Sequence, residues 1–227
     1  MNEKQIAAKK AVEFIKDGMT VGLGTGSTVS FLIKELAEKM TAGLKITAVS
    51  TSNFTTQLAS SLGINVFDIN AVNKIDLTID GADEVDNKLD GIKGGGGALL
   101  YEKIVAQNSE KNIWIVDSSK LVKKLGSFPL PVEVVHFGSD HLLNTFNRMN
   151  FNPQFRMKEG KKFLTDAGNF IIDLKLNLIE DANALDEKLK KITGVVETGL
   201  FCGIADQVVI GNADGTVSVK KRDQTNS

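Results

Sequence analysis

The stretch Ile75-Asp-Leu-Thr-Ile-Asp-Gly-Ala-Asp-Glu84 indicates both the fold and the place of the chemistry. Its first six residues alternate between apolar and polar side chains, which predicts a strand. Asp80 ends this strand, and Asp83 follows on the loop. Open α/β sheets bind ligands at the carboxyl ends of their strands. We therefore expect this loop to face a ligand.

A run of glycines comes next in the chain. The segment Gly91-Ile-Lys-Gly-Gly-Gly-Gly97 places Lys93 directly before four consecutive glycines. Such a run carries a high cost in backbone entropy, so packing alone does not explain it. It lets backbone N–H groups approach an anion or a polar substrate closely. We expect this run to contact the same ligand.

Glu102 lies on the helix that is predicted to start at Ala98, directly after the glycines. Its neighbours three and four residues away share its face of the helix and are all apolar: Ala98, Leu99, Val105 and Ala106. A carboxylate against apolar surface tends to have a raised pKa, which suits a general base. The alternative is a first-turn acidic residue that the helix dipole stabilises. The nearby Asp80, Asp83 and Lys93 favour catalysis.

The composition excludes several classes of protein. The chain has 227 residues, of which 42% are hydrophobic and 24% are charged, as is typical of a soluble globular protein. Its net charge of −1 gives no sign of a nucleic-acid or membrane partner. One cysteine, Cys202, fits a reducing compartment. The chain shows neither a signal peptide nor an apolar run long enough to span a bilayer, so we expect a cytoplasmic protein. With two histidines, His136 and His141, far in sequence from the carboxylates, a metal would depend mainly on carboxylates.

Gly24-Thr-Gly-Ser-Thr28 is a second candidate for ligand binding. It follows a short predicted strand, 20–23, and precedes a predicted helix, so a phosphate would lie at a helix N-terminus. The hydroxyls of Thr25, Ser27 and Thr28 favour phosphate, and Ser27 or Thr28 could cap the helix. The loop matches neither a dinucleotide fingerprint nor a Walker A loop. The alternative is a tight turn with an N-cap.

Strands alternate with helices along the first half of the chain, which predicts a mostly parallel sheet with helices on both faces. The predicted strands there include 45–50, 64–69, 75–80 and 112–117. Lys120 follows the last of these, where a solvated surface lysine is the alternative to a ligand contact. Prolines at Phe128-Pro-Leu-Pro131 indicate a boundary. Helix, hairpin, helix and a strand at 195–201 then predict a smaller α+β domain.

We expect the last hairpin, with its turn at 212–215, to return to the first sheet. The predicted domains are therefore residues 1–128 with 201–227, an α/β catalytic domain, and residues 129–200, the small α+β domain.

The motifs together resemble ribose-5-phosphate isomerase of the A type. They are Gly24–Thr28, Asp80–Glu84, Lys93–Gly97 with the Glu102 helix, Phe128-Pro-Leu-Pro-Val-Glu-Val134 and Gly199-Leu-Phe201. They occur in this order over nearly the whole chain. The resemblance implies a Rossmann-like α/β domain with a smaller α+β domain. It also implies a protein that usually forms a homodimer or a larger assembly and that needs neither a metal nor an organic cofactor. It also implies a cytoplasmic enzyme of the pentose phosphate pathway.

The resemblance further implies roles for individual residues. Glu102 is the general base for interconverting ribose 5-phosphate and ribulose 5-phosphate. The residues that would hold the sugar phosphate are Thr25, Gly26, Ser27, Thr28, Asp80, Gly81, Ala82, Asp83, Lys93, Gly94, Gly95, Gly96 and Lys120. Lys4 falls where the family has a substrate-contacting lysine.

This chemistry agrees with the residue patterns. One carboxylate can move a proton between C2 and C1 through an enediolate, while Lys93 or glycine N–H groups stabilise the oxyanion. Either Asp80 or Asp83 can assist ring opening. The sequence leaves two alternatives open: a sugar-phosphate sensor domain without catalysis, and an acyl or CoA transferase that uses Glu102 as nucleophile. A sensor for gene regulation would need a DNA-binding module, and no helix-turn-helix precedes residue 20.

Overall fold

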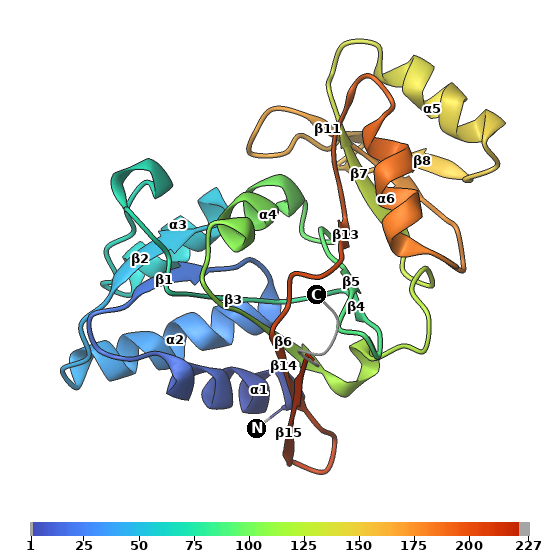
Figure 1. Cartoon of the computed structure of the whole chain (residues 1–227). Coiled ribbons are helices and arrows are strands. Elements are labelled where there is room, and N and C mark those ends of the chain that lie inside the picture. Colours follow the sequence, from blue (N-terminus) through green and yellow to red (C-terminus); the bar gives the residue numbers. More distant parts are fainter. Residues whose placement is uncertain (1, 223–227) are drawn as a thin grey trace. The chain divides into compact units, whose positions relative to one another are not determined.

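The computed structural model describes residues 2–222. They divide into two compact units, each assembled from separated stretches of the chain (Figure 1). The first unit holds the chain up to Ala82, Tyr101–Leu121 and the residues from Gly203 onward. The second holds Asp83–Leu100 and Val122–Cys202.

A six-stranded sheet forms the centre of the first unit, in the order β15-β14-β6-β3-β1-β2. Five strands of this sheet, β1, β2, β3, β6 and β14, pair with their neighbours in parallel, and β15 runs antiparallel to β14. This confirms the mostly parallel sheet and the return of the last hairpin to it. The strands are β1 (Thr20–Leu23), β2 (Thr47–Ser50), β3 (Leu77–Asp80), β6 (Asn112–Asp117), β14 (Gln207–Gly211) and β15 (Val217–Lys221).

Helices cover both faces of this sheet, as predicted (Figure 1). Helices α1 (Glu3–Ala11) and α2 (Ser27–Thr41) pack on one face, where their alanines and leucines share a core with Leu23 and Ile113. The short helix η1 (Val12–Phe14) continues α1, and α3 (Asn53–Ser61) lies beside β2. On the other face, Val105 of α4 (Leu99–Gln107) approaches Gly22 so closely that a Cβ there would lie 2.8 Å from Val105 Cγ1.

Antiparallel sheets and two helices make up the second unit, which confirms the α+β prediction. Its largest sheet has the order β12-β7-β11-β8 and packs against α5 (Ser139–Arg148) and α6 (Ala182–Lys190). A second sheet has the order β13-β5-β4. The strands are β4 (Glu84–Val85), β5 (Gly91–Ile92), β7 (Leu130–Val134), β8 (Pro153–Phe155), β9 (Met157–Lys158), β10 (Lys161–Lys162), β11 (Phe170–Leu174), β12 (Val195–Thr198) and β13 (Leu200–Phe201).

The compact units divide the chain differently from the predicted domains. The predicted larger domain includes residues 83–100, 122–128 and 201–202, which belong to the second unit. Pairing explains the first stretch, since β5 lies between β4 and β13. For the second stretch, the buried carboxylate of Glu84 accepts the N–H groups of Gly126 (2.7 Å) and Phe128 (2.6 Å).

Two predicted strands and one predicted boundary need correction. Residues 64–69 form only one bridge, between Ala48 and Val66, and then the short helix η2 (Ile69–Ala71). The strand predicted at 195–201 is broken at Gly199 into β12 and β13, which pair in different sheets. The proline-rich stretch read as a boundary contains β7, a fully buried strand between β12 and β11.

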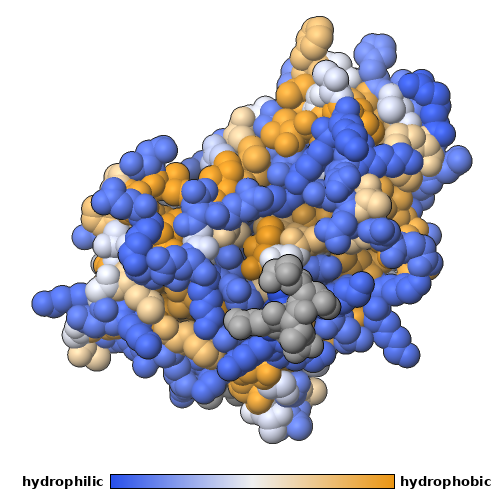
Figure 2. Space-filling model, in the orientation of Figure 1, coloured by the Kyte–Doolittle hydropathy of each residue, from blue (hydrophilic) through white to orange (hydrophobic). Residues whose placement is uncertain are grey.

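The surface is mainly hydrophilic on the face seen in Figure 2, with smaller hydrophobic areas between the polar residues. Within residues 2–222, no helix has the length and apolar character needed to cross a membrane.

Candidate functional site

The strand order of the first unit reverses at β1, which lies between β2 and β3. In open α/β sheets this is the point where ligands bind. Here the loop after β1 meets the end of β3: Asp80 Oδ1 accepts the N–H groups of Thr25 (2.9 Å) and Gly81 (2.7 Å). A Cβ at Gly24 would lie 2.0 Å from the same oxygen, so this approach requires glycine. Asp80 therefore joins the Gly24–Thr28 loop to the end of β3, which are the two ligand-binding segments that the sequence analysis identifies separately.

The hydroxyl of Thr25 has a structural task. Its Oγ1 lies 2.8 Å from the hydroxyl oxygens of both Thr51 and Ser52, and Thr55 Oγ1 donates to the Gly24 carbonyl at 2.7 Å. These bonds hold the Gly24–Thr28 loop against the start of α3. The Thr25 side chain thus contributes to the shape of the loop.

Helix α2 begins with Gly26 as its N-cap, at φ +117°, a conformation that favours glycine. The expectation that Ser27 or Thr28 caps the helix is therefore wrong, since both lie inside it. Gly26 makes no side-chain hydrogen bond that caps α2, and Ser27 is exposed at the N-terminus of this helix. An α-helix N-terminus of this kind is suited to an anion.

One lysine lies close to the N-terminus of α2. Lys4 on α1 donates through Nζ to Ser27 Oγ at 2.9 Å. Its neighbour Glu3 accepts the N–H (3.1 Å) and the hydroxyl (3.0 Å) of Ser118, in the turn η3 (Ser118–Lys120) that follows β6. The first turn of α1 therefore contacts both the loop after β1 and the turn that carries Lys120, which is half-buried.

Glu102 has the apolar surroundings that its spacing predicted. It is 3% exposed on α4, and the four neighbours at its face are all buried, with exposures of 8% or less: Ala98, Leu99, Val105 and Ala106. The apolar arc is thereby confirmed.

Asp83 and the glycine run lie together in the second unit. Asp83 Oδ2 accepts the Gly95 N–H at 2.7 Å, and the Asp83 N–H donates to the Ile92 carbonyl at 2.8 Å. A Cβ at Gly95 would lie 2.5 Å from Asp83 Oδ1. The run is therefore folded closely around this carboxylate, which explains one of its glycines.

Lys93 is 2% exposed, although it is charged. Its N–H donates to the Gly199 carbonyl at 2.9 Å, and its Nζ lies 5.1 Å from the centre of the Phe201 ring. A Cβ at Gly199 would come within 2.4 Å of the Lys93 carbonyl oxygen. The motif Gly199-Leu-Phe201 thus packs against the lysine of the glycine run.

Glu133, from the middle of β7, is a buried carboxylate that the residue patterns did not assign. It is 1% exposed, and its Oε1 accepts the Thr165 hydroxyl (2.9 Å) and the Asn169 side-chain amide (3.0 Å). Burial raises the pKa of Glu133 above its ordinary value, against these hydrogen bonds, and the nearby Glu197 raises it further.

The predicted site residues fall into two groups, one in each compact unit. The first unit holds Thr25, Gly26, Ser27, Thr28, Asp80, Gly81, Ala82, Glu102 and Lys120, and the second holds Asp83, Lys93, Gly94, Gly95 and Gly96. Lys4 joins the first group through Ser27.

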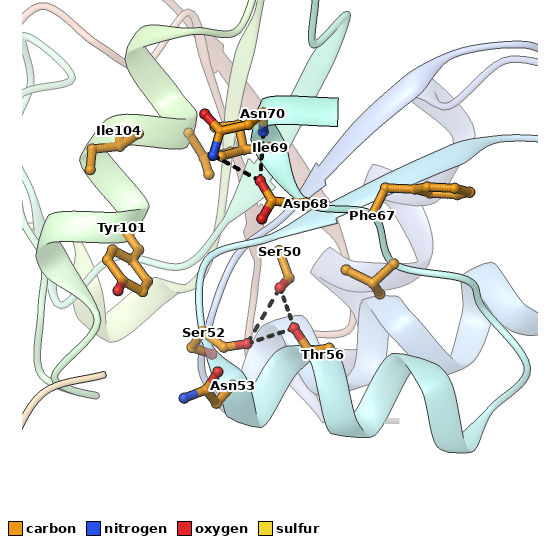
Figure 3. A pocket seen from close by; sticks show the side chains of 12 residues that line it. Ser50, Ser52, Asn53, Thr56, Phe67, Asp68, Ile69, Asn70, Tyr101 and Ile104 are labelled. Atoms are coloured by element: carbon orange, nitrogen blue, oxygen red, sulfur yellow. Dashed lines mark hydrogen bonds between the residues drawn. The ribbon is translucent and has the colours of Figure 1, made fainter. Parts of the chain in front are cut away.

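A cavity of about 530 Å³ in the first unit is lined in part by Ser50, Ser52 and Thr56 (Figure 3). Tyr101 and Ile104 of α4 line one side and the start of α3 lines the other. Its polar side chains bond to one another: Ser50 lies 2.6 Å from Thr56 Oγ1, and Asp68 accepts the side chain of Asn70. The predicted site residues are outside its described lining.

Metal binding receives no support from the described part of the chain. Among residues 2–222, no three His, Cys, Asp or Glu side chains are grouped closely enough to hold an ion.

Comparison with known proteins identifies the family. The sequence model of ribose 5-phosphate isomerase A (phosphoriboisomerase A) matches residues 47–215. Ribose-5-phosphate isomerase A of Streptococcus suis is 51% identical over 223 residues, which is 98% of this chain and all of that protein. The chain belongs to the ribose 5-phosphate isomerase A family.

Solved structures of this family agree with the fold. A D-ribose-5-phosphate isomerase in complex with phospho-erythronic acid has a TM-score of 0.94 at 40% identity, over 98% of this chain and 100% of that one. Ribose 5 phosphate isomerase A from Neisseria gonorrhoeae has a TM-score of 0.90 at 41% identity, over 97% and 96%. A second sequence model, the DeoR C-terminal sensor domain, matches only residues 1–70, a stretch that contains the Gly24–Thr28 loop but not Glu102.

Proposed function

We propose that this chain, as an aldose–ketose isomerase, interconverts D-ribose 5-phosphate and D-ribulose 5-phosphate through an enediolate, with Glu102 as the general base. Membership of the ribose 5-phosphate isomerase A family supports the reaction. The observation that supports Glu102 as the base is the burial of its side chain, which is 3% exposed and lies among apolar neighbours on its face of α4. A carboxylate in such surroundings is suited to accept a proton from carbon.

The reaction needs one base that reaches two carbons. The base removes the proton from C2 of the aldose and returns it to C1, while a second proton moves between the two oxygens. One carboxylate serves both carbons because they are bonded neighbours. A rigid helix supports this role, since small errors in the position of a base cost large factors in rate.

The substrate's phosphate is proposed to bind at the N-terminus of α2. Gly26 opens the helix without a side-chain cap, and its first helical residue, Ser27, is exposed. Lys4 Nζ lies 2.9 Å from Ser27 Oγ and adds a positive charge to the helix dipole. Lys120, on a turn that Glu3 joins to α1, is proposed as a further phosphate contact.

The remaining predicted residues are proposed to bind the sugar. Asp83 is the better candidate for assisting ring opening because it is half-buried, whereas Asp80 is 2% exposed and bonds to two backbone N–H groups. Lys93 and the N–H groups of Gly94 and Gly96 are proposed to stabilise the oxyanion, while the Gly95 N–H holds Asp83. Gly81 and Ala82 complete the proposed contacts.

Assembly and location belong to the same proposal. The family resemblance supports a homodimer in the non-oxidative pentose phosphate pathway, and one cysteine in 227 residues fits a cytoplasmic enzyme.

The test is Glu102→Gln, which keeps the shape of the side chain but cannot accept the proton. We expect kcat to fall by about 10² to 10⁴ and substrate binding to survive. Exchange of the C2 proton of ribose 5-phosphate with deuterium oxide should be lost in step with kcat. Glu110→Gln, an exposed glutamate just after the same helix, is the matched control and should exchange at the wild-type rate. Wild-type exchange by Glu102→Gln would refute the assignment.

A sensor without catalysis is the second candidate, because the sensor-domain model matches residues 1–70. The same experiment separates the two. A sensor would bind ribose 5-phosphate, with neither turnover nor C2 exchange in the wild-type protein.

A further inference from the structure

Arg156 contacts the glycine run from the second unit's largest sheet, directly after β8. Its Nη1 donates to the carbonyls of Gly94 (2.6 Å) and Gly95 (3.1 Å). The rest of its guanidinium is bound to Asp173 of β11, with Nε donating to Oδ2 at 3.0 Å and Nη2 donating to Oδ1. The two side chains are only 15% and 19% exposed.

The backbone of Arg156 is fixed as well. Its N–H donates to the Ile171 carbonyl at 2.9 Å, and its carbonyl accepts the Phe163 N–H at 2.8 Å. A guanidinium that is bound bidentately to a carboxylate loses most of its freedom. Arg156 thus presents Nη1 to the two glycine carbonyls from a rigid support.

Peptide planarity passes this constraint to the amide groups. In a trans peptide the carbonyl of one residue and the N–H of the next point in opposite directions. Fixing the carbonyls of Gly94 and Gly95 therefore directs the N–H groups of Gly95 and Gly96 away from Arg156. The first of these N–H groups donates to Asp83 Oδ2 at 2.7 Å, in agreement with this geometry.

Glycines need such a constraint more than other residues. Without a Cβ, each one samples many backbone conformations, and within the run the Gly97 N–H bonds only the Gly94 carbonyl, at 3.0 Å, so the Gly95 carbonyl depends on contacts such as Arg156. A positive charge on the carbonyl side also polarises the peptide groups and makes their N–H groups stronger donors.

We propose that Arg156, anchored by Asp173, is a positioning residue: it orients and polarises the Gly96 N–H for the reaction's oxyanion and the Gly95 N–H that holds Asp83. The proposal rests on the proposed function of this glycine run. Arg156 acts through the peptide groups and need not touch the substrate.

Arg156→Lys is the decisive variant. It keeps a positive charge beside Asp173 but cannot supply the fork that serves the carboxylate and two carbonyls together. We expect kcat to fall by about tenfold to a hundredfold, with KM changed by less than about threefold, because the oriented amides act mainly in the transition state. The amide resonances of Gly95 and Gly96 in an ¹H–¹⁵N spectrum should also shift.

Asp173→Asn is the second variant, in case the lysine variant fails to fold. It leaves Arg156 in place with a weaker anchor, and we expect a smaller fall in kcat, of about threefold to tenfold. Lys124→Met is the matched control, because it removes an exposed ion pair with Glu180 in the same unit. It should leave kcat, KM and the glycine resonances unchanged.

Two results would overturn the proposal. One is a folded Arg156→Lys or Asp173→Asn protein with wild-type kcat and unshifted glycine resonances. The other is a loss of stability in urea with kcat unchanged, which is what a purely structural ion pair predicts. Failure of the Glu102 assignment would appear separately, as C2 exchange in Glu102→Gln, and the amide resonances report on Arg156 without turnover.

Discussion

Replacing Gly24 by alanine tests the junction between the loop after β1 and the end of β3. The added Cβ would lie 2.0 Å from Asp80 Oδ1 and 2.1 Å from Asp80 Cγ. Nonbonded carbon contacts need about 3.5 Å, so one of the two segments must move by about 1.5 Å. The hydrogen bond from the Thr25 N–H to Asp80, 2.9 Å long, cannot survive a displacement of that size.

The expected magnitude follows from these two effects. Overpacking a close contact costs about 1–3 kcal/mol, and loss of a hydrogen bond to a charged group adds about 1.5 kcal/mol or more. We therefore expect the free energy of unfolding to fall by about 2–4 kcal/mol. Because the same loop carries the proposed phosphate site, kcat/KM should fall by about 10².

Urea unfolding and steady-state kinetics measure the two effects. Gly81→Ala is the control for stability, because the nearest atom to its added Cβ is the Thr25 carbonyl oxygen at 3.7 Å, an ordinary contact. It should change the free energy of unfolding by less than about 0.5 kcal/mol. If Gly24→Ala is as stable and as active as the wild type, the Asp80 junction does not hold the loop in the way described.

Three further predictions concern the phosphate, a buried carboxylate and metal. Ser27→Ala should raise KM by about threefold to tenfold and leave kcat within about twofold, because Ser27 Oγ anchors Lys4. An unchanged KM with a collapsed kcat would count against the phosphate site at the N-terminus of α2. Burial raises the folded-state pKa of Glu133, so its contribution to stability is present at low pH and is lost as pH rises through the folded value. The stability of the wild type relative to Glu133→Gln, measured in urea between about pH 4 and pH 8, should therefore decline with rising pH, and a constant difference would refute this reasoning. EDTA should leave activity unchanged, because the described residues hold no cluster of three metal-ligating side chains; loss of activity that a divalent ion restores would contradict it.

The first unit was predictable from the sequence because its signals are local and strong. Ile75–Asp80 alternates clearly, and the apolar neighbours of Glu102 recur at helical spacing. The parallel sheet, its helices and the return of the last hairpin all followed from such patterns. Sheet order did not, because the pairing of β1 with both β2 and β3 depends on packing.

The second unit was less predictable because its strands are short and pair over long sequence distances. Two residues such as Gly91-Ile92 carry no periodicity, and β5 is a strand only because it pairs with β4 and β13. Arg156 gave no signal for the same reason: its partners Gly94 and Gly95 are 62 and 61 residues away. In the first unit, the sequence predicts the wrong N-cap for α2 because the φ angle of Gly26 depends on the whole loop.

The interleaving of the two units has a consequence for synthesis on the ribosome. Strand β6 ends at Asp117, but its neighbour β14 begins only at Gln207, after most of the second unit has been made. At roughly 5–20 residues per second, the apolar edge Ile113-Trp-Ile-Val116 waits roughly 5–20 s for its partner strand. An unpaired edge of this kind invites pairing with another chain. Nascent chains that stop before Gln207 are therefore expected to aggregate through β6, even though every proposed catalytic side chain has already been synthesised.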